Sequence, residues 1–172
     1  ACSNEENVVA DLLAEMKGKL KGEDHTRVLD SSLQDQGYVA LGIPGRCTAL
    51  FGAMSWANAD VVAMLLKAGA NVNSLDVMGN DALTYASVYG RPNNVQCWLE
   101  RVKEWDINRQ NTVLGACALG SAVYFGSNKL ETAKVLLNAG ASLDYRTFSG
   151  SNVLTNAVEN EDSDPDVIRI IL

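Results

Sequence analysis

A residue pattern that predicts a pair of short apolar helices recurs along this chain at a nearly fixed interval. The pattern of a capping residue, any residue, Leu, two residues and Ala begins at Thr48, Asp81, Cys117 and Asn152. The successive steps are therefore 33, 36 and 35 residues (81−48, 117−81 and 152−117). A period in this range is typical of stacked repeats, in which each unit buries its apolar face against the next one.

The clearest copy reads TALFGAMSWANADVVAMLLKAGANVN at residues 48–73 and resembles the ankyrin repeat family. The residues that carry the resemblance are Thr48, Leu50, Ala53, Val61, Val62, Leu65, Leu66, Gly69, Ala70, Val72 and Asn73. The copies also depart from the family pattern, because none of them has the usual Pro after the cap or the usual His, and Cys117 stands where Thr is common. The resemblance implies an all-α ankyrin-repeat solenoid of helix-turn-helix units with connecting hairpin loops.

Three regions are predicted along the chain. Residues 8–13, VVADLL, match the second-helix sequence VVAMLL at residues 61–66 in five of six places, so the chain is expected to open with half a repeat. The predicted regions are an N-terminal capping helix at 1–21, a long connector or arm at 22–44, and about four repeats at 45–172, divided as 45–75, 76–110, 111–146 and 147–172.

Side-chain types predict how each unit begins and ends. Thr48, Asp81 and Asn152 are expected to cap their helices, each contributing about 1 kcal/mol, whereas Cys117 is a poor cap. Gly69 and Gly140 follow the second helices and are expected to adopt a left-handed backbone conformation. Small residues allow adjacent units to approach closely at the equivalent positions Ala53, Ala86, Ala122 and Ala157.

Charge and composition narrow the classes of function. A net charge of −7 argues against nucleic-acid binding and favours a basic partner. The sequence contains no apolar run near the roughly 20 residues that span a bilayer, and no secretory leader, so no membrane partner is expected. The predicted location is intracellular, in the cytoplasm or the nucleus.

The sequence predicts neither a catalytic site nor a metal site. His25 is the only histidine, and no Ser or Cys nucleophile motif accompanies it. The four cysteines, at positions 2, 47, 97 and 117, lack metal-binding spacing, and Cys97 is expected to be a small buried hydrophobe. The acidic stretch 159–166 lacks the glycine and the terminal glutamate of a calcium loop. No enzymatic activity, catalytic residue, metal or cofactor is therefore predicted.

The resemblance implies a partner-binding face made of the hairpin tips and the exposed side of each first helix. Aromatic rings recur there in three consecutive repeats, and Glu159 and Asn160 hold the same positions in the fourth. The predicted partner-contacting residues are Ser55, Trp56, Val77, Met78, Asn80, Val88, Tyr89, Val113, Leu114, Tyr124, Phe125 and Phe148. An exposed stripe of this kind marks a binding site. In the alternative interpretation, the rings fill the joints between repeats or lie beneath the arm at 37–44.

The function implied by the resemblance is protein–protein interaction, with a peptide or a folded protein held in the concave groove. One alternative is a regulatory or targeting domain of a larger protein, such as an enzyme or a channel. Another is self-association through the apolar last helix, VIRIIL at residues 167–172, which ends without a polar capping repeat.

Overall fold

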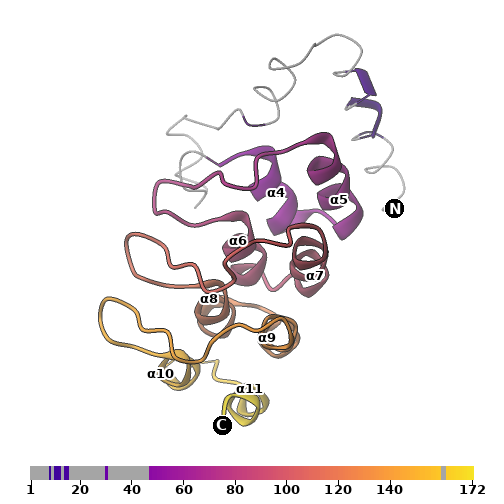
Figure 1. Ribbon diagram of the computed structural model, residues 1–172. Coiled ribbons are helices and arrows are strands. Elements are labelled where there is room, and N and C mark those ends of the chain that lie inside the picture. The colour runs from indigo at the N-terminus through magenta and orange to yellow at the C-terminus, as the bar shows by residue number, and fades with distance from the viewer. Residues whose placement is uncertain (1–7, 9, 13, 16–29, 31–46, 160–161) are drawn as a thin grey trace.

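Four helical pairs are stacked in a row in the computed structural model of the chain, which describes residues 8, 10–12, 14, 15, 30, 47–159 and 162–172 (Figure 1). The regular elements within these ranges are helices. The first helices of the pairs are α4 (Ala49–Trp56), α6 (Ala82–Val88), α8 (Ala118–Phe125) and α10 (Val153–Glu159). The second helices are α5 (Ala59–Ala68), α7 (Pro92–Arg101), α9 (Lys129–Asn138) and α11 (Pro165–Ile171). The predicted all-α ankyrin-type solenoid is confirmed.

The first helices form one layer and the second helices form another, and the hairpin loops all project on the side of the first helices (Figure 1). Contacts run from each first helix to the next one, and from each second helix to the next one. The core therefore extends along the row between the two layers, and each unit depends on its neighbours for burial.

Small side chains let the first helices pack closely. Ala53, Ala86, Ala122 and Ala157 are all buried, as predicted. The second layer adds large residues to the core, and Trp98 of α7 is fully buried with its ring edge against Trp105 at a centroid distance of 5.3 Å. None of the helices in the described part of the chain is long and apolar enough to cross a bilayer.

The helix ends follow the predicted chemistry with one exception. The carboxylate of Asp81 accepts the Thr84 backbone N–H over 2.7 Å, and Asn152 caps α10 in the same way through Thr155. Thr48 has the extended backbone of a capping residue, but its buried hydroxyl makes no capping hydrogen bond, so the prediction of a side-chain cap there is wrong. Cys117 makes none either, as predicted.

The predicted left-handed glycines are confirmed. Gly69 and Gly140 have φ angles of 93° and 92°, a backbone conformation that residues other than glycine rarely adopt. Each follows a second helix and turns the chain toward the next hairpin. These two positions therefore set the direction from which each hairpin leaves the helical layer.

The N-terminal predictions fall largely outside the described residues. Residues 8, 10–12, 14 and 15 are helical, with Val8 and Leu12 exposed. Of the connector at 22–44 only Asp30 is described, and its carboxylate accepts the backbone N–H of Asn71 over 2.8 Å. The capping helix, the arm and the repeat boundaries stay predictions.

Candidate partner-binding groove

Buried polar side chains hold the hairpin tips in fixed conformations with their apolar residues pointing outward. In the first hairpin, Asp76 Oδ1 accepts the backbone N–H groups of Met78 and Asn80, both over 2.8 Å. In the second hairpin, Asn111 Oδ1 accepts the N–H of Leu114 over 2.8 Å. These hydrogen bonds order the tips internally. The exposed side chains there include four large apolar ones, Val77, Val113, Leu114 and Phe148.

Backbone hydrogen bonds join adjacent hairpins into one continuous edge. The N–H of Thr112 donates to the Met78 carbonyl over 3.1 Å, and the N–H of Phe148 donates to the Leu114 carbonyl over 3.0 Å. A Cβ added to Gly115 would lie 2.8 Å from Cδ1 of Phe148, so the phenyl ring lies directly over this glycine. The exposed tips are therefore ordered before any partner arrives.

The predicted aromatic stripe is divided into two clusters. Trp56 packs against Tyr89 with ring centroids 5.2 Å apart, and Tyr89 lies 6.4 Å from the buried ring of Tyr85. Tyr124 and Phe125 form a separate pair at 4.6 Å with an interplanar angle of 72°. Among the described residues, no ring contact links Tyr89 to Phe125.

A groove of about 480 Å³ lies beside the second cluster, between the hairpins at 111–116 and 147–151 and the helices α8 and α10. Its polar lining includes Ser121, Asn156 and Glu159. Its apolar and aromatic lining includes five predicted contact residues, namely Val113, Leu114, Tyr124, Phe125 and Phe148. The structure thus gathers residues from two hairpins and two helices around one hollow.

The groove exists because small side chains stand where another repeat has a large one. Four residues after the cap, α6 carries Tyr85, whereas α8 carries Ser121 and α10 carries Asn156. Tyr85 is buried under the first hairpin, where its hydroxyl contacts the Asp76 carboxylate at 3.0 Å and the Cys47 thiol at 3.1 Å. Neither Ser121 nor Asn156 is large enough to fill the equivalent space under the later hairpins.

The floor of the groove is tightly packed around Tyr145. A Cβ added to Gly120 would lie 1.7 Å from the Tyr145 hydroxyl oxygen, so only glycine fits there. The same oxygen accepts a hydrogen bond from Nδ2 of Asn156 over 2.6 Å. Burial raises the pKa of Tyr145 above its ordinary value, so the ring stays neutral. The residues beneath the groove are therefore closely packed and held together by a hydrogen bond.

Charge is nearly absent from this face. The helices α4, α6 and α8 contain no Asp, Glu, Lys or Arg. Glu159 is the one charged side chain among the described residues that line the groove. Asp81 lies on the same side but is buried, and its desolvation raises its pKa despite the hydrogen bonds from Thr84. The groove therefore presents aromatic rings, neutral polar groups and a single carboxylate.

Comparison with known proteins agrees with this architecture. The family model described as the ankyrin repeat matches residues 46–77. The phosphocholine transferase AnkX of Legionella pneumophila is 32% identical over 120 residues, which cover 68% of this chain and 12% of that protein. The chain belongs to the ankyrin-repeat family.

Two further relatives match a similar share of this chain at a similar identity. The ankyrin repeat and SAM domain-containing protein 6 of Rattus norvegicus is 31% identical over 71% of this chain and 13% of its own length. The nuclear factor NF-kappa-B p105 subunit of Gallus gallus is 35% identical over 66% of this chain and 12% of its own length. This ankyrin-repeat chain therefore spans about an eighth of the length of the curated relatives it matches.

Two of the predicted contact residues are engaged inside the protein. Ser55 is only 2% exposed, and its hydroxyl donates to the Phe51 carbonyl over 2.9 Å, so its assignment to the exposed face is corrected. The side chain of Asn80 donates to Asp76 and accepts from Asn111, which fastens two hairpins together. Both residues support the ankyrin fold and offer little to a partner.

The other predicted residues lie outside the groove but near the same face. Trp56 is 52% exposed and Val77 is exposed, whereas Met78, Val88 and Tyr89 are half-buried. Gly120, Ser121 and Asn156, in contrast, line the groove and were absent from the predicted set. Aligning the repeats at the position four residues after the cap shows that only the second repeat has a large side chain there, Tyr85, but this alignment alone does not single out Ser121 and Asn156.

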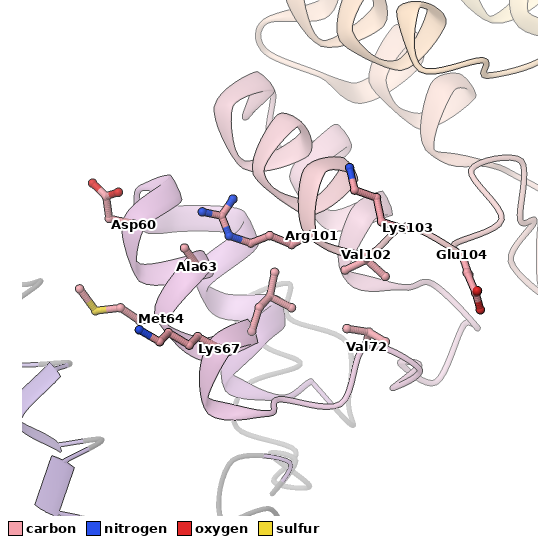
Figure 2. Close-up of a pocket in the computed structure, with 10 residues that line it drawn as sticks. Asp60, Ala63, Met64, Lys67, Val72, Arg101, Val102, Lys103 and Glu104 are labelled. Atoms are coloured by element: carbon pink, nitrogen blue, oxygen red, sulfur yellow. The ribbon is translucent and has the colours of Figure 1, made fainter.

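A second, larger hollow of about 950 Å³ lies on the side of the second helices (Figure 2). Figure 2 shows Arg101 extending from the end of α7 toward Ala63 of α5, and Lys67 of α5 lines the same hollow. Asp60 and Glu104 also line this hollow, so charges of both signs are mixed around its apolar floor. It contains none of the predicted contact residues.

Proposed function

We propose that this ankyrin-repeat domain binds a protein or peptide partner through the groove at the joint of α8 and α10. Ankyrin repeats are generally protein-interaction modules, and the proposal specifies where this chain makes the contact. The observation that carries it is the convergence of Val113, Leu114, Tyr124, Phe125 and Phe148 around one hollow. An exposed apolar surface rimmed by polar groups is the usual mark of an interaction site.

Two physical properties favour this surface over the rest of the described chain. Phe125 is 56% exposed and Phe148 is 70% exposed, so a partner that covers both rings removes a large apolar area from water. The hairpins are already ordered by internal hydrogen bonds, so little conformational entropy is lost on the ankyrin side when the partner binds.

Selection from a displayed peptide library against the immobilised domain tests the proposal. Enriched peptides, resynthesised and titrated, are expected to bind the unaltered domain and to lose about tenfold or more in affinity for a Phe125→Ser/Phe148→Ser double variant. The matched control is Trp56→Ser, which removes an exposed ring from the other aromatic cluster and is expected to leave the affinity unchanged.

Thermal unfolding of each variant separates lost binding from lost structure. Because both phenylalanines are exposed, the double variant is expected to keep the melting temperature of the unaltered domain within a few degrees. The proposal fails if a folded double variant binds the selected peptides as tightly as the unaltered domain.

Ankyrin-repeat domains are typically not catalytic. The transferase activity in the name of AnkX is a property of that protein, of which this chain matches 12% of the length. The proposal therefore assigns binding alone to the groove. Whether the domain serves a larger regulated protein stays a prediction, as does the intracellular location.

Self-association is a second candidate, favoured by apolar exposure on the last unit. Val158 of α10 and Leu172 after α11 are both exposed. Two copies that pair through these residues would bury them. Sedimentation equilibrium of the full chain is expected to give a mass that rises with concentration, and a Val158→Asp variant is expected to stay monomeric. A monomeric mass for the unaltered chain at high concentration would exclude this candidate.

A further inference from the structure

The groove combines aromatic rings with an uncompensated carboxylate. Tyr124 and Phe125 pack edge to face, with an interplanar angle of 72°, and both line the groove. Phe148 contributes a third ring from the neighbouring hairpin. Glu159 lines the same hollow, and no cation among the described residues pairs with it. Three aromatic rings and one negatively charged side chain therefore line a single groove.

Each of these groups attracts a cation. The faces of aromatic rings carry partial negative charge and attract guanidinium and ammonium groups within about 6 Å of the ring centroid. Glu159 adds a full negative charge, and the protein as a whole carries −7. No lysine or arginine lines the groove within the described residues, so no positive charge there opposes an incoming cation.

Hydrogen-bond acceptors in the groove favour a cation with several donors. Asn156 uses its Nδ2 on Tyr145, while its Oδ1 makes no hydrogen bond within the described part of the chain. The hydroxyl of Ser121, likewise without a described partner, lines the groove beside it. Together with the Glu159 carboxylate, these oxygens can accept from a planar group that has five N–H donors and also stacks on rings, which is the guanidinium of arginine.

We propose that the groove at the joint of α8 and α10 binds an arginine side chain of the partner, with the guanidinium against Tyr124, Phe125 and Phe148 and its charge balanced by Glu159. This inference rests on the proposed function and specifies the chemistry of the partner. It places the specificity of the domain in one pocket. The alternative occupant, an uncharged apolar side chain, would gain from the rings but would leave the carboxylate unpaired.

A titration with a minimal pair of probes tests the inference without knowledge of the partner. Acetyl-arginine N-methylamide and acetyl-citrulline N-methylamide have nearly the same shape, but only the first is charged. Chemical shifts of backbone amides at 113–125 and 147–159 are followed as each probe is added to the full chain. The arginine probe is expected to bind about two- to fivefold more tightly than the citrulline probe.

Variants assign the preference to its proposed source. Glu159→Gln and, separately, Phe148→Ala are each expected to reduce the arginine preference, and the exposed Glu104→Gln serves as the matched control that leaves it unchanged. Phe148 and Glu159 are both exposed, so the variants are expected to fold. Circular dichroism of each variant verifies this before the titration.

The outcomes separate this inference from the proposed function. Equal binding of the two probes, or an arginine preference that survives both groove substitutions, overturns the arginine site. Library peptides that still require Phe125 and Phe148 would then leave the groove as a binding site for neutral segments. An arginine preference that depends on Glu159, combined with no selectable peptide, would support the cation site while contradicting the broader proposal.

Discussion

The joint between α4 and α6 and the joint between α8 and α10 use equivalent positions in opposite ways. At the first joint Tyr85 is buried beneath its hairpin, and Phe51 packs edge-on against it at a centroid distance of 4.8 Å. At the later joint Ser121 and Asn156 stand at the position of Tyr85, and a groove remains. The same fold therefore produces a filled joint or an open one, and the large side chain of Tyr85 distinguishes the filled joint.

The two joints also differ in where their aromatic rings lie. At the first joint the rings contact one another across the two helices, and only Trp56 remains strongly exposed. At the later joint Phe125 and Phe148 are both exposed around the hollow. A ring that fills a joint contributes to stability, whereas we expect a ring left beside a hollow to contribute little to stability and to be available to a partner, and this distinction can be measured.

The largest expected difference is between truncations of one ring at each joint. Tyr85→Ala removes a buried ring and leaves a cavity, which is expected to cost about 3 to 5 kcal/mol in the free energy of unfolding. Phe148→Ala removes a ring that is 70% exposed and is expected to change it by less than about 0.5 kcal/mol. Urea denaturation of both variants measures this contrast, and equal losses would contradict the distinction between filled and open joints.

A second pair of variants tests the packing of helical glycines. Gly120→Ala would place a Cβ 1.7 Å from the Tyr145 hydroxyl oxygen, so a loss of about 1 to 3 kcal/mol is expected. Gly52→Ala adds a methyl group in open space within α4, and a gain of about 0.5 to 1 kcal/mol is expected from improved helix propensity. Thermal or urea unfolding distinguishes the two, and a stabilising Gly120→Ala would show that the floor of the groove is not tightly packed.

A third test introduces a large side chain at the open joint between α8 and α10. Ser121→Tyr places in α8 the side chain that α6 already carries, so the groove is expected to close. The expected cost in stability is about 1 to 3 kcal/mol, because Ser121 is itself buried and the larger ring must displace its neighbours to reach the hollow. Binding of the arginine probe, followed by amide chemical shifts, is expected to be lost. Unaltered probe binding by the folded variant would mean that position 121 does not control access to the groove.

The smallest expected effect is a pH dependence at the first joint. Burial raises the pKa of Asp81 in the folded protein, so the folded state binds a proton there more readily than the unfolded state does. The contribution of this group to stability is therefore greatest at low pH and declines as the pH rises through its folded pKa. Asp81→Asn is expected to gain stability over the unaltered protein as the pH increases from about 4 to 7.

Unfolding free energies of both proteins at several pH values measure that effect. Asparagine keeps the ability to cap the helix, so the comparison isolates the charge. In the reverse trend, the free energy of unfolding of Asp81→Asn would fall relative to that of the unaltered protein as the pH rises. That result would indicate that the ion pair between Asp81 and Arg109, at 3.8 Å, outweighs the cost of burying the carboxylate.

Much of the fold could be predicted from local residue patterns. The repeat interval, the alanines at the close contacts and the glycines after the second helices each act within one unit or between adjacent units. Asp81 and Asn152 act as predicted for the same reason, since a cap requires only its own helix. Thr48 fails because the surroundings that bury its hydroxyl are set by contacts beyond its own helix.

The candidate site could be predicted only in part. The exposed tips and the rings of α8 follow from the repeat pattern, and five of those residues do line one groove. Ser55 is at the position equivalent to Tyr124, yet it is buried. The division of the rings into two clusters could not be predicted from the repeat pattern, because ring contacts depend on distances between helices and not on spacing along the chain.

Stacked helical pairs with outward hairpins follow from local sequence, because helix periodicity, caps and left-handed glycines are properties of short segments. Which joint is filled and which is open depends instead on packing between segments that are distant in the chain. That outcome depends on whether side chains from two hairpins and two helices together fill the space that packing leaves between them. For Tyr85 they do, and for Ser121 and Asn156 they leave the groove in which we place the arginine of a partner.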